Sequence, residues 1–205
     1  MMAEVDVALT DYVLAIECAA FAYALEPSDA LAHWLASMFA ALAIGSAAGG
    51  TVHGFCRDGS AGERILWPLA LLALGLAALS AWGAGACLVA SDAWGARIVA
   101  FACVAWLAYG AAVVAGARTF AVAIANVLGA SAFLTVGLVL EFVHDERGAL
   151  VAAAGMGLVF AGAGMQHARV ACPRLHLTHN GLFHIVQSAA LALLFCGARR
   201  LTGRS

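Results

Sequence analysis

Three histidines, His176, His179 and His184, stand at the start of the last long apolar run of the chain, together with Asn180 and Gln187. The run is long enough to cross a bilayer as a helix. Imidazoles are costly in hydrocarbon, so they usually face the interior of a protein or a water-filled cavity. We therefore interpret this polar start of an apolar helix as the centre of the candidate functional site.

Zinc is the cofactor that these side chains predict. Imidazole and carboxylate suit zinc, iron or a similar first-row ion, and a catalytic zinc typically takes three protein ligands and one water. We expect His53, His179 and His184 to bind the metal. Asp11 or Glu63 would then serve as the general base or would orient a ligand. On a regular helix His179 and His184 point about 140° apart, so both reach one ion only if a π-bulge lies between them.

The composition indicates that the solvent of this chain is lipid. Of its 205 residues, 64% are hydrophobic and 11% are charged, whereas a typical soluble domain has about 25% charged residues. All ten basic residues are arginine, which excludes a retinal Schiff base and a Walker-type phosphate lysine. The net charge of −2 argues against nucleic acid as a partner, because nucleic acid requires a basic face.

Seven apolar runs of about 20 residues predict an all-α, polytopic membrane protein, a bundle of seven transmembrane helices. The expected helices cover residues 6–25, 30–54, 64–89, 93–115, 118–143, 148–168 and 175–198. They form a single integral-membrane domain over residues 1–205, in which the short loops make neighbouring helices antiparallel. The arginines divide five and five between the two sides, so they indicate neither an orientation nor a particular membrane.

Seven crossings gather polar residues on the side of the membrane where the chain begins. That side holds the start of the first helix, the end of the second, the start of the third, the end of the sixth and the start of the seventh. These ends carry Asp11, His53, Glu63, His167, His176, His179 and His184. Glu17 and Gln187 lie deeper and need partners there. We expect a polar cavity that opens to this one face.

The six cysteines show no CxxC pair, so a thiolate zinc site is not predicted. Cys56 and Cys172 fall on the same side of the expected bundle, where a disulfide would form only in an oxidising compartment. We expect both of them to be reduced and unpaired.

Two segments carry a family resemblance, Gly49-Gly50-Thr51-Val52-His53 and His179-Asn180-Gly181-Leu182-Phe183-His184. With the seven helices, they resemble the superfamily of alkaline ceramidases and adiponectin-type receptors. The resemblance implies a zinc-dependent amide hydrolase that acts on lipids within the membrane, with His53 and His184 at two of its histidine positions. The sequence departs from that pattern at Gly49, where the family has a serine, and at Asn180, where it has another histidine. In addition, the family's aspartate at the start of the third helix can correspond only to Glu63, which lies at the very mouth of that helix.

Three functions are compatible with these patterns. The first is a metal-dependent hydrolase of a lipid-like amide or ester, surrounded by membrane lipids that supply its substrate. The second is a transporter, proton-coupled sensor or receptor, in which Asp11, Glu17, His184 and Gln187 form a relay or a ligand pocket without metal. The third is a structural scaffold whose polar residues only hold the helices together.

Overall fold

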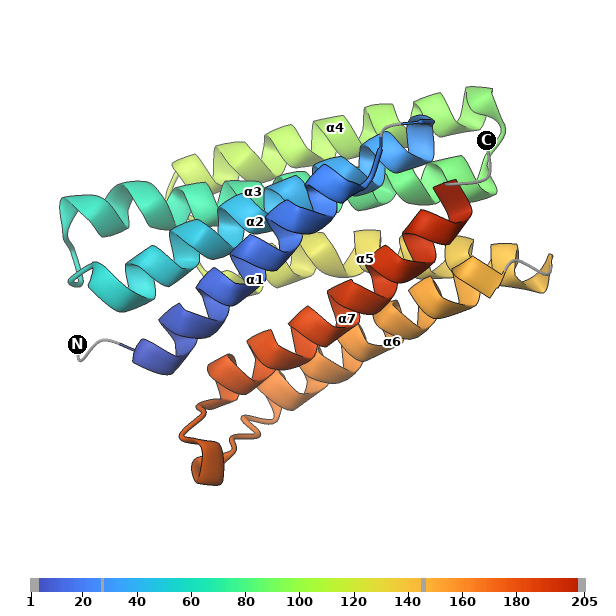
Figure 1. The fold of residues 1–205 in the computed structure, drawn as a ribbon. Helices are drawn as coiled ribbons and strands as arrows, with labels where there is room; N and C mark the ends of the chain where they lie inside the picture. Colours follow the sequence, from blue (N-terminus) through green and yellow to red (C-terminus); the bar gives the residue numbers. More distant parts are fainter. Residues whose placement is uncertain (1–3, 27, 145–146, 203–205) are drawn as a thin grey trace.

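The computed structural model describes residues 4–26, 28–144 and 147–202, and this part of the chain is helical apart from short connections (Figure 1). The long helices are α1 (Val5–Ala24), α2 (Ala30–Phe55), α3 (Ala61–Val89), α4 (Asp92–Val114), α5 (Phe120–Val143), α6 (Arg147–His167) and α7 (His179–Thr202). A 3-10 turn, η1 (Pro173–Leu175), lies between α6 and α7. By length and composition, six of the seven long helices, α2 to α7, are apolar enough to cross a membrane.

The helix boundaries follow from local signals near the predicted ones. Helix α3 begins at Ala61 rather than at residue 64, because the Ser60 hydroxyl accepts a hydrogen bond from the Glu63 N–H at 3.2 Å and caps the helix. Helix α7 begins at His179 rather than at residue 175. The preceding residues form η1, and His176 then adopts a left-handed conformation with φ of 54°.

The helices pack as a closed ring of six, with one helix outside (Figure 1). Around the ring the order is α1, α2, α3, α5, α6 and α7, and α7 returns to α1. Helix α4 packs on α3, outside this ring. One apolar cluster fills the ring; its members include Leu14, Phe39, Ala81, Leu134, Met156 and Leu194, one from each ring helix. The ring is therefore a packed core and not an open channel.

The contact between α6 and α7 is close enough for their backbones to meet. A Cβ added at Gly155 would lie 2.6 Å from the Ala190 carbonyl oxygen, and one at Gly197 would lie 2.5 Å from the Gly148 carbonyl oxygen. Small residues allow such approach where lipid supplies no hydrophobic drive between helices. Helix α7, which carries the candidate site, is thereby held at a fixed position on α6.

Candidate functional site

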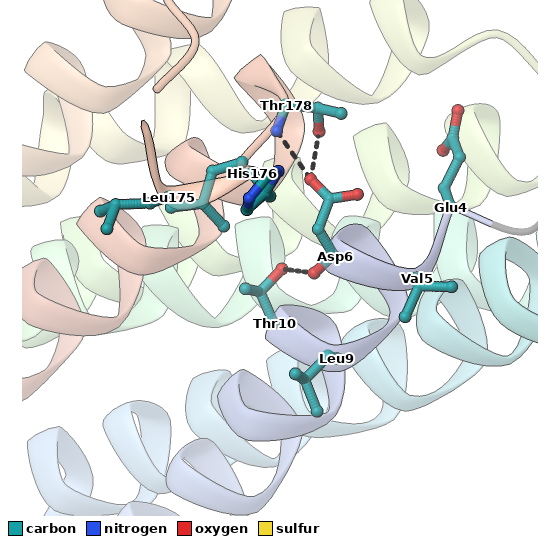
Figure 2. A pocket seen from close by; sticks show the side chains of 9 residues that line it. Glu4, Val5, Asp6, Leu9, Thr10, Leu175, His176 and Thr178 are labelled. Atoms are coloured by element: carbon teal, nitrogen blue, oxygen red, sulfur yellow. Dashed lines mark hydrogen bonds between the residues drawn. The ribbon is translucent and has the colours of Figure 1, made fainter. Parts of the chain in front are cut away.

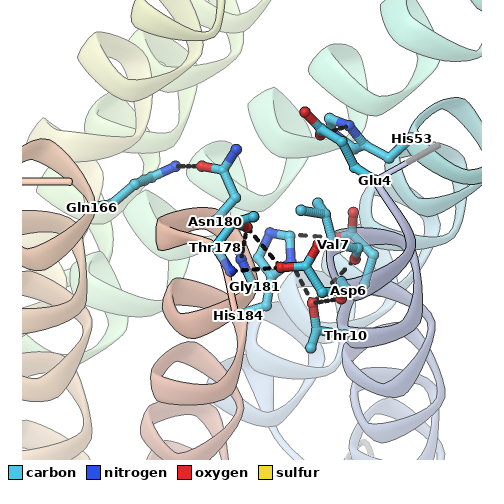
Figure 3. A network of polar contacts seen from close by, with 11 residues as sticks. Glu4, Asp6, Val7, Thr10, His53, Gln166, Thr178, Asn180, Gly181 and His184 are labelled. Carbon is cyan, nitrogen blue, oxygen red and sulfur yellow. Dashed lines mark hydrogen bonds and ion pairs between the residues drawn. The ribbon is translucent and has the colours of Figure 1, made fainter. Parts of the chain in front are cut away.

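The polar ends of the ring helices meet where α1 begins. The Glu4 N–H donates to the His53 carbonyl oxygen at the end of α2, at 3.2 Å. Two residues further along the chain, the Asp6 carboxylate accepts from both the backbone N–H and the hydroxyl of Thr178, each at 2.7 Å. Figure 3 shows these contacts around the first turns of α1. Helix α1 thus joins α2 to α7 on one side of the bundle.

Asp11 and His184 form the most buried polar pair of this region. The His184 Nε2 lies 3.5 Å from the Asp11 Oδ1, and the two side chains are 14% and 8% exposed. On the other side of the imidazole, the His184 Nδ1 lies 3.1 Å from the Thr10 hydroxyl oxygen (Figure 3). The imidazole is therefore held between two consecutive residues of α1.

The Thr10 hydroxyl determines where the protons of this pair are. It lies 2.8 Å from the Asp6 carbonyl oxygen, to which it donates its one proton. It must then accept from the His184 Nδ1–H, so the Nε2 is the ring nitrogen that exchanges a proton with Asp11. The neutral pair is a protonated Asp11 beside a neutral imidazole, and the ionic pair is a carboxylate beside an imidazolium. Both forms hold one proton between the two side chains.

Two glycines of α2 make room for the Asp11 side chain. A Cβ at Gly50 would lie 2.9 Å from the Asp11 Cβ, and one at Gly49 would lie 3.4 Å from the Asp11 Oδ2. Helix α1 therefore packs closely against α2 at the position of the carboxylate. A similar fit occurs on α7, where a Cβ at Gly181 would lie 2.6 Å from the Asp6 Oδ2.

His53 has a different partner from the one that its predicted role requires. Its Nδ1 lies 2.9 Å from the Glu4 Oε2, and its ring lies edge-on to Trp67 with the centroids 6.1 Å apart. Helix α1 packs against α2, which carries His53, and against α7, which carries His184, and α2 and α7 also contact each other. His53 and Glu4 therefore form one pair, and His184 and Asp11 form another.

Two other predicted site residues lie at helix starts. The Glu63 carboxylate accepts from the Gly59 N–H, while its own N–H donates to Ser60, so Glu63 caps α3. His179 is the first residue of α7 and is half-buried. Its neighbour Asn180 accepts a hydrogen bond from the Gln166 side chain of α6 at 3.1 Å. Neither Glu63 nor Asn180 is directed to the Asp11–His184 pair.

These placements bear on how zinc would fit. A catalytic zinc requires three protein ligands, and within residues 4–26, 28–144 and 147–202 no three His, Cys, Asp or Glu side chains come together as a metal-binding group. Both nitrogens of His184 already have partners on α1. As arranged here, His53, His179 and His184 do not make a zinc site. The six cysteines, Cys56 and Cys172 among them, are free.

Polar contacts between α1 and α7 continue inward from the Asp11–His184 pair to Glu17 and Ser188 and then end. We call this line of contacts the polar seam. The Ser188 hydroxyl donates to the Glu17 carboxylate, and the Gln187 Oε1 is a buried oxygen with no partner in the described part of the chain. Beyond them lie three aromatic rings, Phe21 stacked on Phe195 at 4.3 Å and Phe39 edge-on to Phe21 at 5.4 Å. The seam is therefore polar on the side where the chain begins and closed by aromatic rings further in.

Four residues of the site were not predicted from the sequence: Glu4, Asp6, Thr10 and Thr178. The predicted topology already placed the start of the first helix beside the start of the last one. The signal that could have identified Asp6 and Thr10 is their spacing of four, which puts both on one face of a helix. Thr178 lies beside His179 and would have followed from the same topology.

Comparison with known proteins gives a family and no further relative. A model of the family DUF6962, described as a family of unknown function, matches residues 7–203. No curated protein matches the chain. No solved structure matches it either.

Proposed function

Because the chain belongs to DUF6962, a family of unknown function, its function must be argued from its own residues, and we propose that it is a proton-coupled membrane transporter. The observation that carries this proposal is the Asp11–His184 pair, buried between apolar helices. Ionisable side chains in such surroundings are expensive and commonly belong to proton relays and ion pathways. Histidine is suited to this role because its ordinary pKa of about 6.5 is near physiological pH.

In this proposal α1 crosses the membrane together with the six other helices. Its 20 residues extend over about 30 Å as an α-helix, which is the thickness of the hydrocarbon. It packs between α2 and α7, and each of its acids finds a partner within the bundle. The acidic side chains of α1 thereby have their partners within the protein and do not face lipid.

The Asp11–His184 pair can change its charge in two ways, by losing the shared proton or by gaining a second one. Removing the shared proton leaves a carboxylate alone between apolar helices, and adding a second one leaves an imidazolium without a counter-charge. Both states are costly unless another charge compensates them. Besides Asp11, the titratable groups at this end of the bundle are Asp6 on α1, His53 on α2, which is paired with Glu4, and His179 on α7 itself. A transported ion that occupies this region would therefore change the proton occupancy of the pair.

The arrangement along α1 and α7 also favours transport over simple sensing. Glu17 and Ser188 provide a second protonatable station further into the bundle, about 9 Å from Asp11 along the helix axis. Phe21, Phe39 and Phe195 close the seam beyond that station. A polar path from one side that ends at an apolar barrier is what alternating access requires of one of its two states.

Infrared spectroscopy tests the proposal without knowledge of the transported solute. The carboxyl C=O band of protonated Asp11 should disappear as the pH of the purified protein is raised. It should be absent from Asp11→Asn and should titrate at a different pH in His184→Gln. Glu63→Gln, which keeps a capping oxygen on α3, is the matched control and should leave the band unchanged. An identical titration in the wild-type protein and Asp11→Asn contradicts the proposal.

The zinc-dependent hydrolase stays a separate prediction with its own test. Protein purified without chelators should contain about one zinc per chain if that hypothesis is correct, and His184→Ala should lose the metal. The proton-coupled proposal expects no bound zinc and an unchanged infrared titration after treatment with a chelator.

A further inference from the structure

A pocket lies on the side of α1 that faces the segment before α7 (Figure 2). Its volume is about 610 Å³, within the range of about 300–1,000 Å³ that small-molecule sites occupy. One wall is the first turns of α1, and the other is the segment Leu175–Thr178. The Asp6–Thr178 hydrogen bonds hold the two walls together.

The lining of this pocket is acidic at one end and apolar at the other. Glu4 and Asp6 contribute carboxylates, His176 contributes an imidazole, and neither arginine nor lysine is present among the described lining residues. Leu9, Leu175 and Leu177 contribute apolar surface. The field inside therefore favours a positive charge that carries an apolar group.

Asp6 keeps an acceptor free for such a ligand. Both of its hydrogen bonds from Thr178 go to the Oδ2, and a carboxylate has about four acceptor sites, so these two bonds do not use all of them. Figure 2 shows Asp6 between Thr178, His176 and Glu4, where this carboxylate borders the pocket. A primary ammonium group carries three donors, so it can bind the Oδ1 and retain further hydrogen bonds to water or to Thr10.

We infer that this pocket binds an organic cation, a primary amine attached to a small apolar group. The assignment is independent of proton transport, because it rests on the volume, the charge and the apolar lining of the pocket. Its relation to the buried pair is structural: Thr10 lines the pocket and its hydroxyl lies 3.1 Å from the His184 Nδ1. A bound amine would therefore lie one side chain away from the proton-carrying imidazole.

Binding of 2-phenylethylamine to the purified protein in detergent tests the inference. The measurement is calorimetric titration at about pH 8, where histidines with an ordinary pKa of about 6.5 are neutral and do not repel the amine. 2-Phenylethanol and 3-phenylpropionate have the same ring with no charge and with a negative charge. We expect saturable binding of the amine, binding of the alcohol at least about tenfold weaker, and none of the carboxylate.

Three variants identify the residues that bind the amine. Asp6→Asn keeps an oxygen for Thr178 and should weaken amine binding by about tenfold or more, because a charge-assisted hydrogen bond is lost. Glu4→Gln should weaken it less, because Glu4 is shared with His53. Asp58→Asn, an exposed carboxylate in the loop on the same side of the bundle, is the control and should bind the amine normally.

The outcomes separate the pocket from its alternatives. Equal affinity for the amine and the alcohol, or undiminished amine binding by Asp6→Asn, overturns the inference. The comparison of the three ligands uses only wild-type protein, so it tests the inference even if a variant fails to fold. Nanodiscs with and without phosphatidylethanolamine identify the source of the ligand. Weaker binding of 2-phenylethylamine in nanodiscs that contain this lipid indicates that the natural ligand is a headgroup amine. Equal binding in both kinds of nanodisc indicates a soluble amine. Failure of amine binding with an intact Asp11 titration contradicts only this inference.

Discussion

At the scale of single residues, the position of Asp11 depends on the absence of side chains at two glycines of α2. The carboxylate is 8% exposed, and the adjacent α2 residues are Gly49 and Gly50, which offer no side chain to displace it. Burial of an acid in an apolar bundle is tolerated when its partner is near and its site is well packed. The two glycines bring Asp11 to that depth, and His184 supplies the partner.

Replacement of Gly50 by alanine should therefore disturb the pair without changing any of its polar atoms. The new methyl group would meet the Asp11 Cβ at 2.9 Å and the Ala8 carbonyl oxygen at 3.2 Å, so α1 must move away from α2. We expect Gly50→Ala to lower the stability by about 1–3 kcal/mol, measured as a lower Tm in detergent, and to alter the infrared titration of Asp11. Gly157→Ala on α6, where a Cβ would meet nothing within 4 Å, should keep the wild-type titration and should not lower the Tm. Equal Tm values for the two variants would contradict this explanation.

At the scale of elements, α1 has two halves with different partners. Its first half places Asp6, Thr10 and Asp11 against α7 and α2 by polar contacts. Its second half packs Phe21 against the rings of Phe39 and Phe195. The change from polar to aromatic contacts along one helix defines how far water can follow the seam, because a packed aromatic cluster excludes it.

Phe21→Ala should open this barrier. Removal of a ring that stacks at 4.3 Å on Phe195 leaves a cavity at the inner end of the polar seam and should cost about 3–5 kcal/mol. If the seam conducts protons, proteoliposomes with this variant should show faster dissipation of an imposed pH gradient than those with wild-type protein. Tyr23→Ala removes a ring of similar size that is 92% exposed on the same helix and should leave the rate unchanged. A lower Tm with an unchanged proton leak would show that the aromatic cluster is only structural.

At the scale of the whole molecule, the ring of six helices includes α1 and leaves α4 outside. Helix α4 exposes large apolar side chains, Trp94, Phe101, Val104, Leu107 and Val114 among them. Such a surface is compatible with lipid and explains how an outer helix remains apolar nearly all round. The polar residues are instead concentrated on the inner contacts of α1.

Chemical labelling tests the proposed crossing of α1. In variants with one cysteine each, Val5→Cys and the natural Cys172 should react with a membrane-impermeant maleimide from the same side of a vesicle. Ser91→Cys, at the start of α4, should react only from the other side. All three should react after the vesicles are permeabilised. If Val5→Cys reacts together with Ser91→Cys, α1 does not cross the membrane.

The sequence predicts the helices of this protein better than it predicts their rotation. Runs of about 20 apolar residues are a strong signal, so all seven long helices were found, with the starts of α3 and α7 displaced by a capping serine and by the turn before His179. Rotation is harder, since lipid is as apolar as a core and an apolar face does not indicate the interior. The sequence predicts Asp11 and His184 as site residues, and one hypothesis places them in a common relay, but the helical pattern does not predict that the two side chains face each other directly.

The backbone contact between α6 and α7 limits which substitutions evolution can accept. Gly155 and Gly197 face main-chain atoms, which are the same for every residue type, so no second mutation can make space for a larger side chain there. Gly162 faces the Val186 side chain instead, with an added Cβ 3.1 Å from it, so bulk gained at Gly162 can be offset by bulk lost at Val186. Among relatives of this chain, the first two positions should be invariant in size, whereas the third should vary jointly with its neighbour.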